Sequence, residues 1–354
     1  MNMPALLNPA APRSLPETVS LLTANVLNLA LPERIFYDAD QVYSTAFYQH
    51  KVSWLGQQLA LLRADVVAVQ EVWDEQALRD VVSRSGLAQY QVHVPGAEND
   101  QGRPGAQGTP CVGLVSRLPL RALRRVEAFP PGCAAELPEL GLQSRFSRAP
   151  LLGLFETPRG QPFYVLTAHL KSQRPKFLQD ASGQLLEDAQ DPRVRTRARM
   201  RSLCLRAVEA AALRTLVIDL LQHTPVPLVL MGDLNDSLHS VTTQIITDQR
   251  ELLHDRAARD TALFNAADIQ TGTALKRDVA YSHVFQGHPE VLDHVLVSEE
   301  FRRDSKFSVG EVLRVDYFND HLKLERDRSF SDHGFVRALL QFGRLGGSDR
   351  HGPQ

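Results

Sequence analysis

Short apolar segments rich in β-branched residues recur along the whole chain, with turn-forming residues between them. Such segments predict β-strands, because β-branched side chains pack well on a pleated, half-buried surface. The expected strands are residues 19–26, 66–70, 111–116, 150–156, 162–168, 226–231, 291–297 and 334–341. Strands in this number, with longer helical segments between them, constrain the fold to packed sheets covered by outer helices.

Three longer segments, 44–63, 74–85 and 195–222, have the composition and spacing of helices. In the last of them apolar residues recur at helical spacing, and we interpret these residues as a core-facing stripe rather than a cofactor site. The stripe consists of Met200, Cys204, Ala207, Val208, Ala211, Thr215 and Ile218.

The expected elements follow one another without a convincing linker or internal repeat, so we expect one domain over residues 17–342. The segments 1–16 and 343–354 are rich in Pro, Gly and polar residues, and we expect flexible termini there. Gly and Pro also gather at 95–110 and 130–141, which predicts long surface loops.

The overall composition excludes several classes of protein. With 43% hydrophobic and 23% charged residues, and no run of about 18 apolar residues, the chain should have no membrane span and no stable membrane association. A formal net charge of -2 gives no global basic field, so any contact with a polyanion must be local. The three cysteines are scattered, which argues against a disulfide framework or a zinc site. A reducing cytoplasm suits these cysteines, and no export signal is evident, so we expect a cytoplasmic protein. We also expect a monomer, without a protein partner that the sequence identifies.

Acidic, amide and imidazole side chains stand at the ends of many of the expected strands. They are Asn25, Glu71, His169, Asp233, Asn235, Asp293, Asp332 and His333. Each alone has an ordinary explanation as a turn residue, a cap, a helix-terminal charge or a buried strand histidine. Together they predict an active site, because side chains at the carboxyl ends of sheet strands can converge on one ligand.

The segment GDLND, residues 232–236, closes one of these strands. Residues two apart on an extended segment point the same way, so Asp233 and Asn235 can address one point in space. Gly, Asn and Asp are equally ordinary turn formers, so the segment alone supports both explanations. We expect no role for Asp236.

Eight short segments, in the same order over residues 20–337, resemble the endonuclease/exonuclease/phosphatase superfamily. The segments are TANVLNL, VVAVQEVW, GLVSRLPL, FSRAPLLG, LTAHLKS, LVLMGDLND, LDHVLVS and SDHGFV. This superfamily includes pancreatic-type deoxyribonucleases, AP endonucleases, neutral sphingomyelinases and inositol polyphosphate 5-phosphatases. The resemblance implies an α/β fold with four layers, in which two packed, mainly antiparallel β-sheets are flanked by helices.

The hard oxygen ligands among the matched residues suit a magnesium or manganese ion, which prefers carboxylates, waters and phosphate. Glu71 and Asp332, with Asn25, are therefore the expected ligands of Mg²⁺ or Mn²⁺. Asn25, Arg148 and Lys171 are expected to hold the substrate phosphate.

The remaining matched residues are expected to be catalytic. Asp293 and His333 resemble the family's carboxylate–imidazole pair, in which the acid fixes the tautomer and stabilises the charged ring. Either Asp233, with Asn235 orienting the water, or His333 would be the general base, and the sequence leaves both open. His169 would donate to a non-bridging oxygen or assist the leaving group.

Arginines crowd the start of the third expected helix, at positions 193, 195, 197, 199, 201 and 206. They do not fall on one stripe and acidic residues precede them, so we favour a solvated helix face over a nucleic-acid contact. Lys171, Arg174 and Lys176 lie closer to His169 and are better candidates for substrate contact.

These residues predict a divalent-metal-dependent phosphodiester hydrolase, a nuclease that acts on DNA or RNA by in-line attack of an activated water. AP endonucleases have a tyrosine in place of His169, which disfavours an abasic-site role. A phosphoesterase acting on a lipid or inositol phosphate is the enzymatic alternative. A non-catalytic binding protein on the same fold is disfavoured, because every matched position has a chemically competent side chain.

Overall fold

The computed structural model describes residues 16–35, 42–97, 109–248, 259–272, 279–322 and 327–343. The termini expected to be flexible, and most of the loop expected at 95–110, lie outside these residues. Those expectations stay untested.

Two six-stranded sheets form the centre of the fold. The first sheet consists, in spatial order, of β15 (Gly310–Phe318), β16 (Phe335–Phe342), β1 (Glu17–Leu29), β2 (Val66–Val72), β4 (Cys111–Ser116) and β3 (Gln91–His93). The second consists of β11 (Leu263–Asn265), β14 (Asp293–Ser298), β10 (Leu228–Asp233), β9 (Pro162–His169), β8 (Leu151–Glu156) and β5 (Leu120–Arg125). Each sheet has one parallel pair, β1–β2 or β9–β10, and is otherwise antiparallel.

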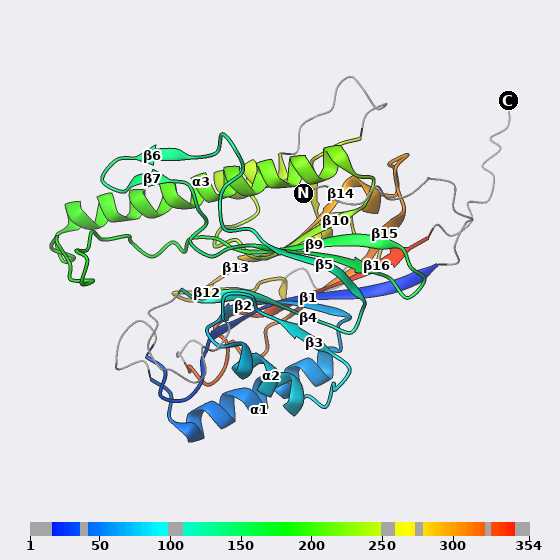
Figure 1. The fold of residues 1–354 in the computed structure, drawn as a ribbon, viewed down its shortest axis with the longest axis horizontal. Helices are drawn as coiled ribbons and strands as arrows, with labels where there is room; N and C mark the ends of the chain where they lie inside the picture. Colours follow the sequence, from blue (N-terminus) through cyan, green and yellow to red (C-terminus); the bar gives the residue numbers. More distant parts are fainter. Residues whose placement is uncertain are drawn as a thin grey trace.

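Helices cover the outer face of each sheet, which completes four layers (Figure 1). On the first sheet lie α1 (Thr45–Leu62) and α2 (Glu75–Arg84), and on the second lie α3 (Pro192–His223) and α4 (Val241–Thr247). The smaller elements are the hairpins β6–β7 (Ala135–Leu137, Gly141–Gln143) and β12–β13 (His283–Phe285, His288–Glu290), helix α5 (Ala266–Ile269) and the 3-10 helix η3 (Glu299–Phe301). The expected four-layer sandwich of mainly antiparallel sheets is confirmed.

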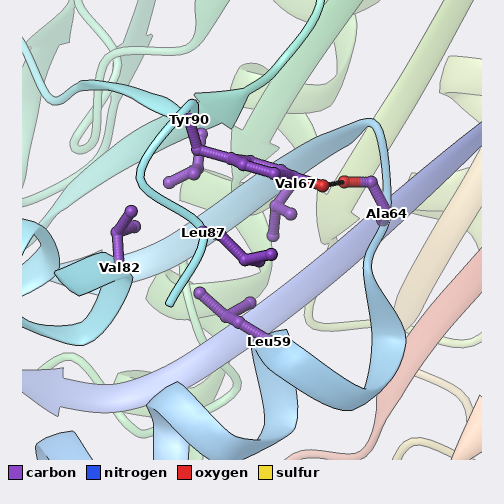
Figure 2. A pocket seen from close by; sticks show the side chains of 7 residues that line it. Leu59, Ala64, Val67, Val82, Leu87 and Tyr90 are labelled. Atoms are coloured by element: carbon purple, nitrogen blue, oxygen red, sulfur yellow. Dashed lines mark hydrogen bonds between the residues drawn. The ribbon is translucent and has the colours of Figure 1, made fainter. Parts of the chain in front are cut away.

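Apolar side chains fill the space between each pair of layers. The central core between the two sheets runs from Val19 on β1 to Phe342 on β16, so both ends of the described chain contribute to it. In the outer layer of the first sheet, Leu59, Leu87 and their neighbours meet without room for a water molecule (Figure 2). The Tyr90 hydroxyl in this layer donates a 2.9 Å hydrogen bond to the Ala64 carbonyl, which satisfies its one polar group.

Every strand and helix expected from the sequence is present, and the elements not foreseen are edge strands, short hairpins and short helices. Strand β5 has the sequence LRALRR. Four of its six residues, Arg121, Ala122, Arg124 and Arg125, are exposed, so the strand lacks a continuous apolar pattern. Helix α3 begins at Pro192, three residues earlier than expected, because the Asp191 side chain caps it by accepting from the Arg193 amide.

The stripe expected on α3 is wrong: none of its seven residues is buried, and Ala211 in the C-terminal half is exposed, as Met200 is in the N-terminal half. The C-terminal half packs on the second sheet through Ala210, Leu213, Val217 and Leu221 instead. Met200 is 50% exposed, whereas Arg201 is 1% exposed. The Arg201 guanidinium forms ion pairs with Glu139 of the β6–β7 turn and with Glu187 of the preceding loop. The N-terminal half of the helix therefore packs against polar segments, and the periodicity of apolar residues does not identify the buried face in either half. Within the described ranges, α3 and the other helices are all too short or too polar to cross a membrane.

Candidate active site

The two parallel strand pairs bring their carboxyl ends together between the sheets. In the first sheet Asn25 of β1 pairs with Gln70 of β2, and in the second His169 of β9 pairs with Asp233 of β10. The Asn25 amide nitrogen lies 3.0 Å from Asp233 Oδ2, although the two residues are 208 positions apart. Both sheets therefore contribute side chains to one site, as expected from the strand-end pattern.

Three of the expected catalytic residues stand side by side on the second sheet. Asp233 pairs in register with His169 on β9 and with Asp293 on β14. His169 Nε2 lies 3.3 Å from Asp233 Oδ2, and both side chains are almost completely buried. Neighbouring register positions on adjacent strands thus place an imidazole and two carboxylates in one row.

The segment that opens with Gly232 is more than a turn. A Cβ atom on Gly232 would lie 1.9 Å from the Ala168 carbonyl oxygen, so only glycine allows β9 and β10 to approach this closely just before the site. Asn235 has a positive φ of 55° and its backbone amide donates to Asp233 Oδ1 over 2.8 Å. The Asn235 side-chain amide donates to the Leu170 carbonyl, which fixes the loop after β9.

Asp293 and His333 form the expected carboxylate–imidazole pair. His333 Nδ1 lies 2.7 Å from Asp293 Oδ2, and His333 Nε2 lies 3.8 Å from Asp233 Oδ2. Burial lowers the pKa of His333, but the carboxylates of Asp293 and Asp233 raise it further, so the pKa lies well above its usual value. The imidazole is therefore charged at neutral pH and lies between two acids.

His169 has the opposite electrostatic character. Burial, with the nearby Arg148 and His333 charges, lowers the pKa of His169 well below its usual value, so this ring is neutral. Its Nδ1 atom is buried and has no hydrogen-bond partner among the described residues. One histidine of the site is thus neutral and the other charged.

The expected metal ligands Glu71 and Asp332 line the same cleft, and the negative charge of Asp332 acts on Glu71. A bulge in β2 gives Glu71 a positive φ of 65°, so the residue lies within the strand and not after its end. Its carboxylate accepts from the Asn28 backbone amide over 3.0 Å and from the Asn25 side chain over 3.4 Å. Burial raises the pKa of Glu71, and the Asp332 carboxylate raises it further. A divalent cation would relieve this repulsion, and the hard oxygen donors fit Mg²⁺ or Mn²⁺.

Asn25 does not offer its side-chain oxygen as a metal ligand in this structure. Its side-chain oxygen accepts from the Leu27 amide over 3.0 Å, while its nitrogen points to Asp233 and Glu71. Asn25 therefore acts as a donor that holds the two carboxylates together.

A second group of possible ligand atoms comprises Asp233, Asp293 and His333, whose ligand atoms lie within 4.8 Å of one another. In this group the charged imidazole already offsets one of the two carboxylate charges. At Glu71 and Asp332 the two acids repel each other, so we favour that pair as the metal site.

Lys51 is a residue of the site that the sequence did not reveal. Its side chain on α1 is completely buried, and its ammonium donates to the Arg328 carbonyl over 3.0 Å and to the Phe330 carbonyl over 3.5 Å. Burial lowers the pKa of Lys51 to about 7, although the Asp332 and Glu71 carboxylates oppose this shift. A lysine in an apolar helix pattern gives no signal that it lies behind two carboxylates from other strands.

The two basic residues expected at the phosphate differ in their placement. Arg148 donates from Nε to the His169 carbonyl over 3.1 Å and lines the cleft. The Lys171 ammonium instead donates to the Ser172 carbonyl and hydroxyl and to the Arg174 carbonyl, and the residue does not line the cleft. In this arrangement Lys171 supports the loop after β9.

A cleft of about 790 Å³ opens above these groups. Glu71, Arg148, His169, Asp233, Asn235, Asp332 and His333 line it, together with one face of α3 and the β12–β13 hairpin. Asn25 and Asp293 lie behind it and are completely buried. The structure thus brings the expected catalytic and metal-binding residues to one cleft or directly behind it.

The arginine run of α3 is not the uniformly solvated face that the sequence favours. Arg201 and Arg206 are buried and ion-paired, Arg206 with Asp236 over 2.7 Å. Asp236, expected to have no role, also accepts from the Thr242 hydroxyl. Arg199 is exposed and lines the cleft. The pairing partners come from distant segments, which the local charge pattern does not show.

Comparisons with known proteins agree with this geometry. A sequence model of the Endonuclease/Exonuclease/phosphatase family matches residues 22–333. A search of curated proteins finds no match. A family protein from Bacteroides thetaiotaomicron shares the fold at 14% identity and a TM-score of 0.56, over 96% of this chain and 99% of that one.

Two further solved structures have the same fold. The mannosyl-6-phosphatase of Bacteroides thetaiotaomicron is 13% identical with a TM-score of 0.53, over 91% of this chain and 99% of that one. The catalytic domain of human nocturnin, solved with a bound sulfate, is also 13% identical with a TM-score of 0.53, over 92% and 94% of the two chains. At these identities the similarity supports the fold alone. The match over residues 22–333 shows that the chain belongs to the endonuclease/exonuclease/phosphatase family, whose members are hydrolytic phosphoesterases that typically use divalent metals.

Proposed function

We propose that the protein is a divalent-metal-dependent phosphodiesterase that hydrolyses nucleic acid. The observation that carries this proposal is the surroundings of Asp233 Oδ2. This atom lies 3.0 Å from the Asn25 amide nitrogen, 3.3 Å from His169 Nε2 and 3.8 Å from His333 Nε2. A buried carboxylate that faces a cleft among these polar hydrogens suits proton transfer during hydrolysis.

Glu71 and Asp332 would hold the metal ion in this site. When bound, a divalent cation would neutralise the charge that develops on the phosphate oxygens in the transition state. Asn25 and the Asn28 amide keep the Glu71 carboxylate in place by donating to it. Lys51 fixes the turn that leads to Asp332.

The pKa shifts favour Asp233 over His333 as the general base. Burial raises the pKa of Asp233, although the charged His333 opposes this shift, and a higher pKa makes the carboxylate a stronger base. The raised pKa of His333 keeps its ring protonated, so it cannot accept a proton at neutral pH. We assign Asp233 to take the proton of the attacking water and His333 to donate a hydrogen bond to a phosphate oxygen. The neutral His169 would supply a second donor.

Basic side chains in the cleft would contact the phosphates of a nucleic acid. Arg148, Arg174 and Arg199 line the cleft, which also has five acidic residues, Glu71, Asp233, Glu290, Asp327 and Asp332. A bound divalent cation would offset part of that negative charge. We further propose that the protein acts as a monomer in the cytoplasm, where its three free cysteines would stay reduced.

The test is an activity panel with Mg²⁺ or Mn²⁺ against duplex DNA, single-stranded DNA, RNA, sphingomyelin and inositol phosphates. We expect metal-dependent cleavage of at least one nucleic acid, and loss of this cleavage in Asp233→Asn. Asp219→Asn removes an exposed acid of α3 and serves as the control. Cleavage of lipid or inositol phosphate alone would contradict the nuclease proposal.

A phosphate ester of a small molecule or lipid is the second candidate. The volume of the cleft, about 790 Å³, lies within the range of small-molecule sites. One protein of the same fold is a mannosyl-6-phosphatase. Release of inorganic phosphate from inositol or sugar phosphates in the same panel would support this candidate.

A further inference from the structure

One face of α3 forms a wall of the cleft. Arg199, Ser202, Leu203 and Arg206 all line the cleft, and their spacing of three, four and seven residues places them on one side of the helix. The wall thus runs along the helix axis, away from the catalytic residues.

The two ends of this wall differ in charge. At the inner end Arg206 pairs with Asp236 and donates to the Lys171 carbonyl, two residues after His169. Arg199 lies seven residues earlier, which corresponds to roughly 10 Å along a helix at 1.5 Å per residue. Arg199 is exposed, and within the described parts of the chain its guanidinium has neither an acidic partner nor a hydrogen bond. The outer end of the wall therefore has an uncompensated positive charge.

Arg174 adds a second such charge at the outer end. The Ser202 hydroxyl donates to the Arg174 carbonyl over 2.5 Å, and the Lys176 amide donates to the Ala198 carbonyl over 2.9 Å. These bonds hold the backbone of Arg174 about one helical turn from Arg199. The Arg174 side chain is exposed and lines the cleft, again without an acidic partner among the described residues.

The hairpin β12–β13 supplies an apolar ring to the same cleft. Phe285, at the end of β12, is 55% exposed and lines the cleft together with Val284. An exposed aromatic face in the same cleft as a basic wall is the arrangement on which unpaired bases stack. A monophosphate held at the catalytic residues would leave both features unused.

We infer that Arg174 and Arg199 form a second phosphate site and that Phe285 stacks on a base, so that the cleft takes a single-stranded polynucleotide. This inference rests on the proposed nuclease function and names its substrate class. The scissile phosphate lies at Asp233 and His333, and a phosphate further along the same strand lies at the outer arginines.

Binding without turnover tests the inference. Fluorescence anisotropy would measure the affinity of fluorescein-labelled oligothymidylate and oligouridylate in EDTA, over a series of salt concentrations. Arg174→Gln and Arg199→Gln should each weaken binding several-fold, and each should make the slope of log K against log[salt] shallower by about 0.7, the value for one phosphate contact on a single strand. Phe285→Ala should weaken binding about ten-fold without changing the salt slope.

Arg193→Gln is the matched control, because Arg193 is an exposed arginine of the same helix that does not line the cleft. Its affinity and salt slope should equal those of the wild type. Equal effects of Arg193→Gln and Arg199→Gln would overturn the second phosphate site. Equal binding of a duplex, with no effect of Phe285→Ala, would overturn the single-strand assignment.

Two further measurements separate this inference from the proposed function. Vesicles of phosphatidylcholine and phosphatidylserine, and inositol hexakisphosphate, serve as alternative polyanions, and binding of these without binding of the oligonucleotides would overturn the substrate class. Hydrolysis of bis(p-nitrophenyl) phosphate with Mn²⁺ reports on the catalytic residues alone. One outcome is a wild-type protein that binds the oligonucleotides as expected but hydrolyses neither them nor bis(p-nitrophenyl) phosphate. This result would contradict the proposed function and leave the binding site supported.

Discussion

His333 and Asp293 form a buried ion pair, with Nδ1 of the imidazole 2.7 Å from Oδ2 of the carboxylate. The same ring lies 3.8 Å from Asp233 through Nε2. The pair thus connects the turn before β16 to two neighbouring strands of the other sheet. A unit built in this way should respond as a whole when either member is removed.

Asp293→Asn and His333→Ala should each lower kcat by about 10² to 10³, the usual cost of losing one donor to the charge that develops in the transition state. The double variant should be little worse than either single variant, because each single change already disables the pair. Single-turnover rates on the substrate found in the activity panel would measure this, with circular dichroism as the control for folding. Independent, additive losses would show that the two residues do not act together.

Asp233→Asn should be as severe, because the amide cannot accept the proton of the attacking water. Asn235→Ala should lower kcat more than it raises KM if Asn235 helps to orient that water, since orientation matters chiefly in the transition state. Steady-state kinetics of the two variants would distinguish these roles. A rate near that of the wild type in Asp233→Asn would show that residues 232–236 form a turn without a catalytic role.

Glu71→Gln should weaken metal binding and abolish turnover without unfolding the protein. The side chain faces the cleft and its negative charge is opposed by Asp332, so loss of the charge removes a metal ligand and costs the core little. Titration calorimetry with Mn²⁺ would give the loss of affinity, and thermal unfolding would report on the fold. Activity that survives exhaustive chelation of the wild type would contradict a metal-dependent mechanism.

Lys51 should make the stability of the metal-free protein depend on pH. Its pKa falls from 10.5 to about 7 on folding, so between these values the unfolded chain binds more protons than the folded one. The free energy of unfolding should therefore rise as the pH rises from about 7 towards 10. Urea unfolding in EDTA should show this rise in the wild type and a smaller rise in Lys51→Met. Lys306→Met, at an exposed lysine, should behave like the wild type.

Asp236→Ala should destabilise the protein by about 1–3 kcal/mol, the cost of leaving a largely buried partner unsatisfied. Asp236 accepts from Arg206 over 2.7 Å and from the Thr242 hydroxyl over 2.6 Å. Removal of the carboxylate would leave the Arg206 guanidinium without its ion pair. Chemical denaturation would measure the loss, and an unchanged midpoint would show that the ion pair contributes nothing.

The secondary structure and the strand-end residues could be read from the sequence because both depend on local patterns. An apolar run such as residues 226–231 predicts a buried strand wherever it lies in the fold. Similarly, a carboxylate at the end of such a run is visible without knowledge of its neighbours. The edge strand β5 escaped prediction because its sequence, LRALRR, lacks that pattern.

The details of the site depend on contacts between distant segments. The protonation of His333 is set by Asp293 and Asp233, which reach it from other strands. Likewise, the bulge that turns Glu71 into the cleft comes from its pairing in the sheet. The sequence leaves the general base open for this reason, since a pKa depends on burial and on charges that only the fold brings near.

The sequence by itself determined the layers of this protein, because the period of apolar residues specifies which segments become strands and helices. The polar residues at its strand ends, in their order along the chain, also identified the family. Only the tertiary structure decided that Lys51 lies behind the expected metal ligands and that Lys171 turns away from the cleft. It also decided that Arg201 and Arg206 form ion pairs whereas Arg199 forms none with any described residue. Burial and partner choice are properties of residues far apart in the chain, and no local pattern encodes them.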